Sequence, residues 1–326
     1  MPDSFFSLPP YTLHEVGNIE TLSDSLQWGL VNLNVPDVWK ETMGEGIRVM
    51  TLDTGTTKHP DLLPNLNLNL AKSFIPNEDV FDTGTFHATH VQGIVASASN
   101  GYGVIGVAPK ATIIPVKVLS KSGMSSGDSV LKGLQYALQV NPDIVNMSLG
   151  TYSPMPKEKE LIKQLVDNGT VVVCAAGNYA EKGVMFPAAY DECIAVGAYM
   201  SSVTRDRASF SAIGPELDFM APGQEILSTF GEDKYAVMSG SSMAAPFISG
   251  VIALLLSKYN KENKKITVAG IKDLLKKHCV DVPSNGFNNE KGFGIVDPKS
   301  LIFAQDVVEA PIVKKSFWQK LLFWRK

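Results

Sequence analysis

Short apolar runs alternate with amphipathic runs along the first two thirds of the chain. The apolar runs carry β-branched residues at consecutive positions, a pattern typical of strands that are buried on both faces. They are GIRVMTLD (46–53), TIIPVKVL (112–119), DIVNMSLG (143–150), GTVVVCAAGN (169–178) and ECIAVGAY (192–199).

The intervening stretches have helical periodicity, which predicts helices over 87–99, 127–141 and 156–169. Asp128 is expected to cap the second helix and Gly169 to end the third. This order of elements predicts an α/β domain with a mostly parallel central sheet and helices on both faces. In such sheets functional residues gather at the carboxyl ends of the strands.

Composition narrows the class of protein. The 326 residues are 44% hydrophobic, and the net charge of -4 with scattered basic residues argues against a nucleic-acid partner. The three cysteines form neither a disulfide framework nor a zinc-site spacing, and Cys174 and Cys193 fall in core-strand runs. The N-terminus lacks the features of a signal peptide, and no run of 18 apolar residues occurs, so a cytoplasmic location is expected.

The segment YAVMSGSSMAAPFISG (235–250) places Ser241 and Ser242 directly before a long apolar helix. A serine hydroxyl becomes a nucleophile when a histidine, oriented by a buried carboxylate, removes its proton. His87 and His90 stand three apart where a helix is expected to begin, and Asp53 ends a predicted strand. Asp before Thr-Gly is equally typical of a plain turn, so the residues alone leave both interpretations open.

Six segments together resemble the subtilisin-like serine protease family, most closely its intracellular branch. They are VMTLDTG, HATHVQGIVAS, NGYGVIGVAP, VVVCAAGN, DFMAPG and MSGSSMAAP, in the family's order, and the Asp, His, Ser order is the one the family is known for. The resemblance implies the subtilisin-like three-layer α/β fold. It also implies a serine endopeptidase that acts on peptides or unfolded proteins.

By this resemblance Asp53 is the orienting carboxylate, His87 the general base and Ser242 the nucleophile. Asn178 and the Ser242 backbone N–H would bind the oxyanion, helped by the positive end of the helix that follows. Gly240 is expected to allow a sharp turn, and Pro246 to fall near the first turn of the helix. His90 is expected to be structural.

Four positions depart from the family pattern. They are Ala88, Gln92, Ser241 and Phe247. Gln92 puts a polar group on a buried helix face, so it needs a hydrogen-bonding partner. Ala88 and Gln92 leave open a catalytically weak pseudoprotease that acts by binding, and the unusual tail leaves open a processing enzyme dedicated to one partner peptide.

The resemblance also implies a substrate groove. Its edge for an extended peptide would be Ser122, Gly123, Met124 and Ser125, and the walls of its primary specificity pocket would be Ser148, Leu149, Gly150, Ala175, Ala176 and Gly177. Walls of glycine, alanine and leucine are expected to admit a large apolar side chain.

A structural calcium ion is expected from the same resemblance. Its oxygen ligands would be Asp61, Asn100 and the carbonyls of Tyr102 and Val104. A simple Asn-Gly turn is the alternative interpretation of this loop.

Three regions are expected: an inhibitory extension (1–26), the catalytic domain (27–306) and a basic, aromatic tail (307–326). The LPPY sequence of the extension resembles the leader of intracellular subtilisins, which lies in the groove as a poor substrate. Cleavage near residues 18 to 26 would then release the enzyme, whereas a disordered tail is the alternative. For the C-terminal tail, contact with a membrane surface, partner docking and packing on the catalytic body stay open, as does a homodimer.

Overall fold

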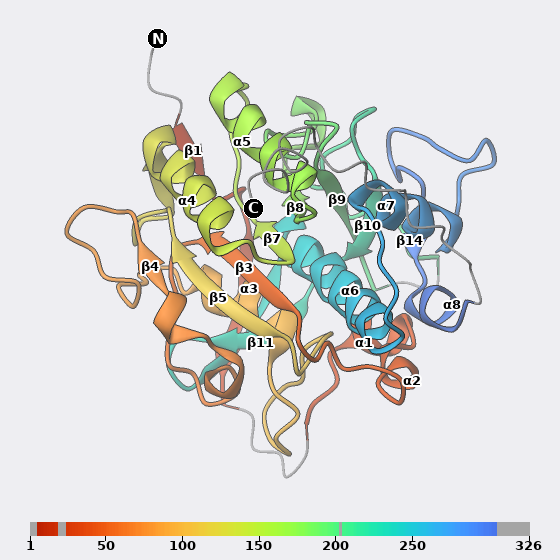
Figure 1. The fold of residues 1–326 in the computed structure, drawn as a ribbon, viewed down its shortest axis with the longest axis horizontal. Coiled ribbons are helices and arrows are strands. Elements are labelled where there is room, and N and C mark those ends of the chain that lie inside the picture. The colour runs from red at the N-terminus through yellow and green to blue at the C-terminus, as the bar shows by residue number, and fades with distance from the viewer. Residues whose placement is uncertain (1–4, 19–23, 202–203, 305–326) are drawn as a thin grey trace, which may run out of the picture.

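A parallel sheet forms the centre of the computed structural model, which describes residues 5–18, 24–201 and 204–304 (Figure 1). Within these residues nine strands lie in the order β13-β14-β10-β9-β8-β7-β3-β5-β4, and only β13 and β14 are antiparallel neighbours. The strands are β3 (Arg48–Asp53), β4 (Lys72–Ser73), β5 (Thr112–Lys117), β7 (Ile144–Met147), β8 (Val171–Ala175), β9 (Ile194–Tyr199), β10 (Phe219–Pro222), β13 (Cys279–Val280) and β14 (Ile295–Val296). The predicted mostly parallel sheet is confirmed.

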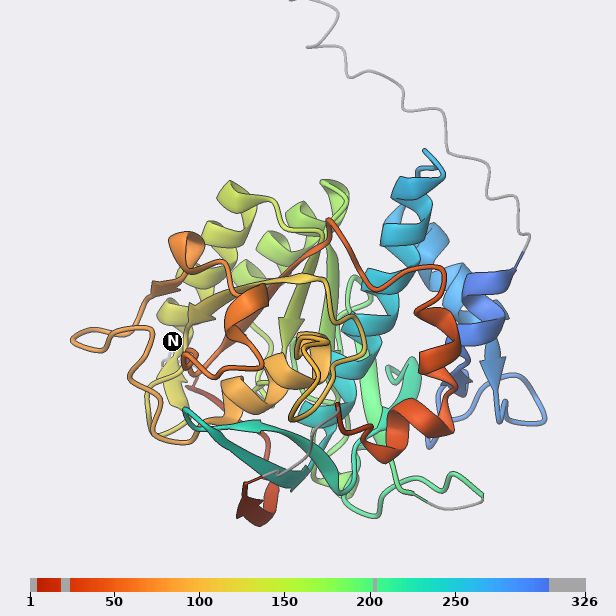
Figure 2. The ribbon, with the colours of Figure 1, turned by 90° about the horizontal axis from the view of Figure 1, so that it is seen from below.

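Helices cover both faces of this sheet, as Figures 1 and 2 show. On one face α4 (Gly127–Val140) packs against α5 (Pro156–Asp167), and on the other α3 (His87–Ala96) packs against α6 (Ser241–Lys261). The shorter helices are α1 (Trp28–Asn32), α2 (Val35–Val38), α7 (Val268–Lys277) and α8 (Pro298–Phe303), with 3-10 turns η1 (Leu63–Asn65), η2 (Leu68–Leu70) and η3 (Ala180–Lys182). The result is the expected three-layer α/β fold.

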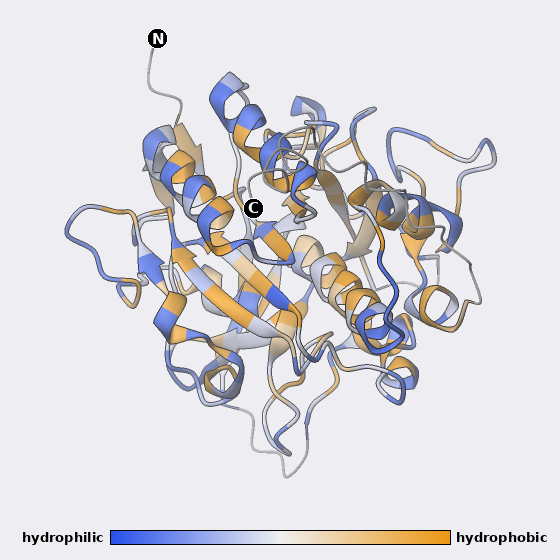
Figure 3. Cartoon of the chain, in the orientation of Figure 1, coloured by the Kyte–Doolittle hydropathy of each residue, from blue (hydrophilic) through white to orange (hydrophobic). Residues whose placement is uncertain are grey.

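The predicted elements are present with shorter ends. α4 buries Val130, Leu134 and Ala137, which are spaced for one helix face, and its other face is polar (Figure 3). Gly169 follows the end of α5 with a φ of +93°, as expected for a helix-terminating glycine. The cap predicted at Asp128 is wrong by two positions, because Ser126 is the N-cap and Asp128 lies inside the first turn.

α6 is the helix that follows the two serines. By length and composition it could cross a membrane, but 89% of its most apolar window is buried inside the protein. It packs against β7, β8, β9 and β10 and is therefore a core helix of this fold. Cys174 and Cys193 are buried in the same core, as expected for thiols in core strands.

The N-terminal segment adds one strand to each of two further sheets. β1 (Phe5–Ser7) pairs antiparallel with β6 (Met124–Ser126). β2 (Thr12–Gly17) pairs antiparallel with β12 (Lys234–Ser239), which forms a hairpin with β11 (Ile226–Phe230). Residues 8–11 therefore connect two strands that are held by different parts of the fold.

Several of the predicted site residues lie at the carboxyl edge of the sheet. Asp53 ends β3, Ser148 follows β7 and Asn178 lies three residues after β8. His87 is the first residue of α3 and Ser242 the second residue of α6, and these two helices pack together on one face. Parallel strands end at the same edge of a sheet, so the fold gathers groups that are far apart in the sequence.

Candidate active site

Asp53 is buried at the end of β3, where the chain turns sharply. Its Oδ1 accepts a hydrogen bond from Thr54 N at 2.6 Å. The turn requires Gly55, since its φ is +117° and a Cβ there would lie 2.1 Å from the Val80 carbonyl oxygen. Lys117 is fully buried on the neighbouring strand β5. Its ammonium donates to the Thr54 carbonyl at 2.8 Å and so stabilises the same turn.

His87 is held by this carboxylate. Its Nδ1 lies 3.0 Å from both oxygens of Asp53, and the residue is completely buried. The preceding Phe86 has a φ of +52°, a conformation that is uncommon for a bulky residue and that recurs at functional sites. His87 Nε2 has no hydrogen-bond partner among the described residues, so this nitrogen is available to accept a proton.

Ser242 is the second residue of α6, and its hydroxyl is engaged elsewhere. Its Oγ donates to the Ser148 carbonyl at 3.4 Å, and no hydrogen bond joins it to His87 in the part of the chain that the structure describes. Pro246 lies inside the helix, beyond the expected first turn, and cannot donate to the Ser242 carbonyl. The Ser148 hydroxyl supplies the missing donor at 3.0 Å, which ties the strand end of β7 to the start of α6.

Asn178 lies against the same helix start. Its Oδ1 accepts from Ser241 N at 2.8 Å, which leaves its Nδ2 free to point outward. Nδ2 donates at 2.7 Å to the backbone carbonyl of Pro10, a peptide carbonyl of the N-terminal segment. The Ser241 hydroxyl accepts from Gly177 N at 3.1 Å and holds this strand end to the helix.

Gly240 is needed for space rather than for a turn. The chain bends here between β12 and α6, as expected, but the φ of 162° is extended backbone that any residue adopts, so the bend itself does not require glycine. A Cβ at this position would lie 3.0 Å from Asn178 Nδ2. A side chain here would therefore push against the amide that binds the Pro10 carbonyl.

The departures from the family pattern fit into the interior. Gln92 is fully buried and makes three hydrogen bonds: it donates to Thr51 Oγ1 (3.0 Å) and the Gly55 carbonyl (2.8 Å), and accepts from Thr56 Oγ1 (2.7 Å). A buried glutamine needs hydrogen-bonding partners, and Gln92 finds them in β3, at Thr51, and in the turn after Asp53. Ala88 is fully buried as well, and its N–H donates to Thr54 Oγ1 at 3.2 Å.

His90 lies beneath the site and is structural, as expected. Its Nε2 donates to the carbonyls of Ile226 and Ala236, both at 3.0 Å. Complete burial lowers its pKa to about 3, so the ring is neutral and joins α3 to the β11–β12 hairpin.

The N-terminal segment lies along the expected groove. Ser7 exchanges two backbone hydrogen bonds with Gly150 (3.1 and 3.0 Å), and Leu8 N donates to the Gly123 carbonyl at 3.0 Å. Met124 and Ser125 pair with Ser7 and Phe6 in the β1–β6 ladder. Ser122 makes its hydrogen bond with Ser120 instead, at 2.8 Å.

Tyr11 covers the histidine at the other end of this groove. Its ring centroid lies 5.2 Å from that of His87. Partial burial, and then the nearby charge of Asp53, raise the pKa of the Tyr11 phenol. The sequence offered LPPY as a groove-binding segment, but no signal in it assigned the tyrosine to the histidine.

In the loop expected to bind calcium, hydrogen-bond donors surround the Asp61 carboxylate. Asp61 Oδ1 accepts from Asn100 Nδ2 (3.0 Å), and Oδ2 accepts from Val104 N (2.9 Å) and Tyr235 OH (3.0 Å). A second carboxylate, Asp24, which the sequence did not reveal, accepts from Gly101 N at 2.9 Å. The carboxylate oxygens of Asp61 and Asp24 are of the type that calcium binds, and the Asn100 amide would join them by turning to present its oxygen in place of its nitrogen.

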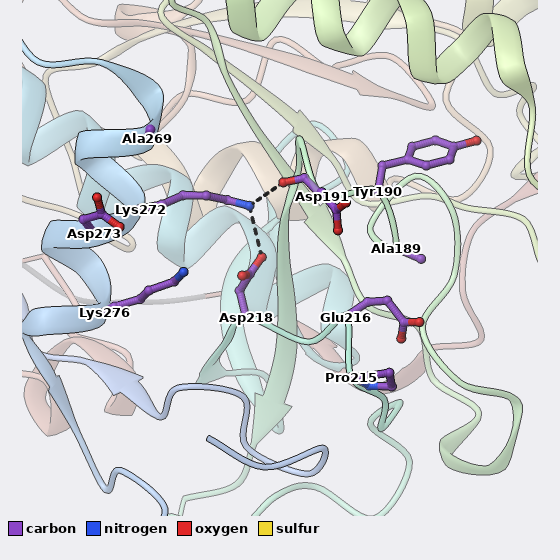
Figure 4. Close-up of a pocket in the computed structure, with 10 residues that line it drawn as sticks. All are labelled: Ala189, Tyr190, Asp191, Pro215, Glu216, Asp218, Ala269, Lys272, Asp273 and Lys276. Atoms are coloured by element: carbon purple, nitrogen blue, oxygen red, sulfur yellow. Dashed lines mark hydrogen bonds and ion pairs between the residues drawn. The ribbon is translucent and has the colours of Figure 1, made fainter. Parts of the chain in front are cut away.

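A charged cavity of about 380 Å³ lies elsewhere, between α7 and the loops beside β9 and β10 (Figure 4). Lys272 bridges it, with its ammonium 2.8 Å from the Asp191 carbonyl and 3.6 Å from the Asp218 carboxylate. Burial raises the pKa of Asp218, and the Lys272 charge opposes that rise. None of the predicted catalytic or groove residues lines this cavity, so it is separate from the candidate active site.

Comparison with known proteins agrees with the geometry. The model of the "Subtilase family" matches residues 44–294. The chain is 38% identical over 266 residues to the "Major intracellular serine protease" of Bacillus subtilis (strain 168), covering 78% of this chain and 81% of that protein. It is 35% identical over 279 residues to "Subtilisin Savinase" of Lederbergia lenta, covering 85% and 99% of the two chains. The "M-protease" of Shouchella clausii (strain KSM-K16) is 37% identical over 247 residues, or 76% of this chain, and the match spans only 63% of that relative's length.

Proposed function

Because the chain belongs to the subtilase family, a family of serine-type endopeptidases, we propose that it hydrolyses peptide bonds through an acyl-enzyme on Ser242. One observation carries the proposal. A buried imidazole is bonded to Asp53 and has no partner for its other nitrogen within the described part of the chain, and it shares a site with an amide donor that holds a peptide carbonyl. We take residues 27–306 as the catalytic domain and extended peptides or unfolded proteins as substrates.

In the proposed reaction the Ser242 hydroxyl rotates from the Ser148 carbonyl toward His87 Nε2. Its proton passes to that nitrogen while Oγ bonds to the substrate carbonyl carbon. The carbonyl oxygen becomes an oxyanion that the Asn178 amide and the Ser242 backbone N–H hold. His87 then gives the proton to the leaving amine, and a water molecule, activated by the same imidazole, later cleaves the acyl-enzyme. Asp53 stays ionised and stabilises the imidazolium in both halves.

Covalent labelling with a fluorophosphonate tests this assignment, because only an activated serine reacts. Intact mass should show one adduct on the wild type and on Ser241→Ala, and none on Ser242→Ala. An adduct on Ser242→Ala, or an unlabelled wild type even with the N-terminal segment removed, would contradict the proposal and favour a binding protein that lacks catalysis.

We also propose that residues 1–26 inhibit the enzyme by lying in its groove. The support is that Phe6 is fully buried, Pro10 offers its carbonyl to Asn178, and Tyr11 covers His87. Pro9 and Pro10 lack the N–H groups that a productive substrate would donate. The cleavage that releases the enzyme is proposed near residues 18 to 26, and residues 19–23 of that stretch lie outside the described part.

Two neighbouring phenylalanines provide a matched test of inhibition. Phe6 is fully buried, whereas Phe5 is 66% exposed. Burying a phenylalanine contributes about 1.5–3 kcal/mol. Phe6→Ser should therefore raise the initial rate on a peptide substrate by roughly tenfold or more, while Phe5→Ser leaves it near the wild-type rate. Deletion of residues 1–20 with no change in rate would refute inhibition and favour an inert extension.

We propose that Asp61, Asn100 and Asp24, with the carbonyls of Tyr102 and Val104, hold a calcium ion. When bound, the ion would link the N-terminal part of the domain to the loop after α3. Chelation should lower the midpoint of thermal unfolding, and added calcium should restore it. An unchanged midpoint would contradict the calcium site and favour the alternative, in which this loop is a hydrogen-bonded turn that binds no metal.

A cytoplasmic location is proposed because one relative carries the name "Major intracellular serine protease". Cell fractionation should recover the protein with soluble cytoplasmic markers. Recovery in the medium or with membranes would contradict the proposal. The C-terminal tail on which the membrane alternative rests lies outside the described residues.

A further inference from the structure

One side chain fills the space between the two expected walls of the primary specificity pocket. Met185 lies between Gly150, in the first wall, and Gly177, in the second. A Cβ added to Gly150 would lie 3.0 Å from Met185 Cε, and a Cβ added to Gly177 would lie 2.9 Å from Met185 Cγ and 3.0 Å from its Sδ. The methionine therefore spans the gap from one glycine to the other.

The backbone holds Met185 in this place. Its N–H donates to the Ala176 carbonyl at 2.9 Å, which fastens it to the second wall. The next residue, Phe186, exchanges two 2.8 Å backbone hydrogen bonds with Thr151, directly after the first wall. Met185 is only 3% exposed, so its side chain is packed between the walls rather than extended into solvent.

We propose that Met185 is the specificity-determining residue of this protease, and that the enzyme cleaves after residues with small side chains. This inference rests on the proposed function and reverses the expectation of a large apolar residue before the cut. Walls of glycine and alanine leave room for a large side chain only if nothing else occupies the space between them. Here the thioether side chain of Met185 occupies that space. Alanine and serine fit beside the methionine, whereas phenylalanine would have to displace it.

The test uses the full chain and two chromogenic peptides that differ only in the residue before the cut, alanine or phenylalanine. The ratio of their kcat/KM values is independent of the time the N-terminal segment spends in the groove, because that time reduces both values equally. We expect the wild type to prefer the alanine peptide by about tenfold or more, the scale of discrimination for a few methylene groups. Met185→Gly should raise the phenylalanine value by about tenfold or more and so erase or invert the ratio. Met185→Leu, which keeps the bulk, should retain the alanine preference.

A wild type that prefers phenylalanine would overturn the proposal without any variant. A Met185→Gly ratio equal to that of the wild type, in a protein whose unfolding midpoint shows it is folded, would also overturn it. Fluorophosphonate labelling of the wild type distinguishes the two proposals. A wild type that is not labelled contradicts the proposed protease function itself. Labelling with the wrong peptide ratio overturns only the assignment of Met185.

Discussion

Glu158 offers a quantitative test of how burial affects this fold. It lies in the first turn of α5, is fully buried, and neither of its carboxyl oxygens has a hydrogen-bond partner among the described residues. Burial raises the pKa of Glu158 to about 8, and the neighbouring Tyr190 hydroxyl lowers it only in part. The folded protein therefore keeps this carboxyl protonated at neutral pH.

The sign of the effect on stability follows from linkage. Below pH 4.5 both the folded and the unfolded protein carry the proton, so burial of the charge has no effect. Between pH 4.5 and about 8 only the unfolded state ionises, and the free energy of unfolding falls as pH rises. At about 1.4 kcal/mol for each tenfold change in proton concentration, the loss approaches 5 kcal/mol above pH 8.

Glu158→Gln removes the ionisation while keeping the size and the neutral polar character of the side chain. In a Ser242→Ala background, which should prevent self-digestion, urea unfolding followed by tryptophan fluorescence gives the free energy of unfolding from pH 4 to 9. The glutamine variant should match its parent near pH 4. It should exceed the parent by about 3–5 kcal/mol at pH 9, a range set by the 1.4 kcal/mol per pKa unit above.

Glu160→Gln is the matched control, because Glu160 is exposed on the same helix. It should change the free energy of unfolding by no more than about 0.5 kcal/mol at any pH, as exposed substitutions usually do. Equal pH profiles for the Glu158→Gln variant and its parent would refute the reasoning. Such a result would mean that Glu158 ionises in the folded state at no free-energy cost.

Three further substitutions test other contacts. Asn178→Ala should lower kcat by about 10²–10³-fold with little change in KM, measured on a peptide substrate, and a loss below tenfold would argue against its oxyanion role. Lys117→Met should destabilise the protein by up to about 3–5 kcal/mol in urea, because it leaves the largely buried Glu78 carboxylate, 3.0 Å from the ammonium, without its ionic partner and with only its hydrogen bond from Lys121 N. The same loss in a Glu78→Gln background would contradict that pairing. Gln92→Leu should lower the unfolding midpoint and kcat together, because the turn after Asp53 loses two hydrogen bonds and β3 loses one; an unchanged kcat would show that the turn needs no such support.

The sheet and its flanking helices could be predicted from the sequence because buried parallel strands need apolar residues on both faces. Asp53 was expected at the carboxyl edge of this sheet because it ends a predicted strand, whereas the role of Asn178 came from the family resemblance. Sequence could not reveal Met185, because a pocket wall of glycines specifies the space beside it and not the side chain that enters from a distant segment. The reason for Gly240 was also hidden, since an extended glycine and a turn glycine look alike until the Asn178 amide is seen beside it.

Ser242 shows a further limit of sequence reasoning. Motif order assigned its proposed role, yet its hydroxyl points to the Ser148 carbonyl and not to the histidine. The same site holds the Pro10 carbonyl, from a segment more than 200 positions away in the chain, and no local pattern reveals that neighbour.

The two strand pairings of the N-terminal segment, β1 with β6 and β2 with β12, lie on either side of residues 8–11 in the chain, the stretch that contacts Asn178 and His87. A tethered ligand of this kind acts at a local concentration in the millimolar range, far above that of the protein in solution. When β1 or β2 separates from its partner strand, the other stays paired. A competing peptide can therefore bind in the groove only while both strands are separated at the same time. Under the proposed inhibition, one cut between this segment and the catalytic domain would end the advantage, because the liberated fragment would diffuse into bulk solvent. Activation would then be governed by dilution, and refolding would not reverse it.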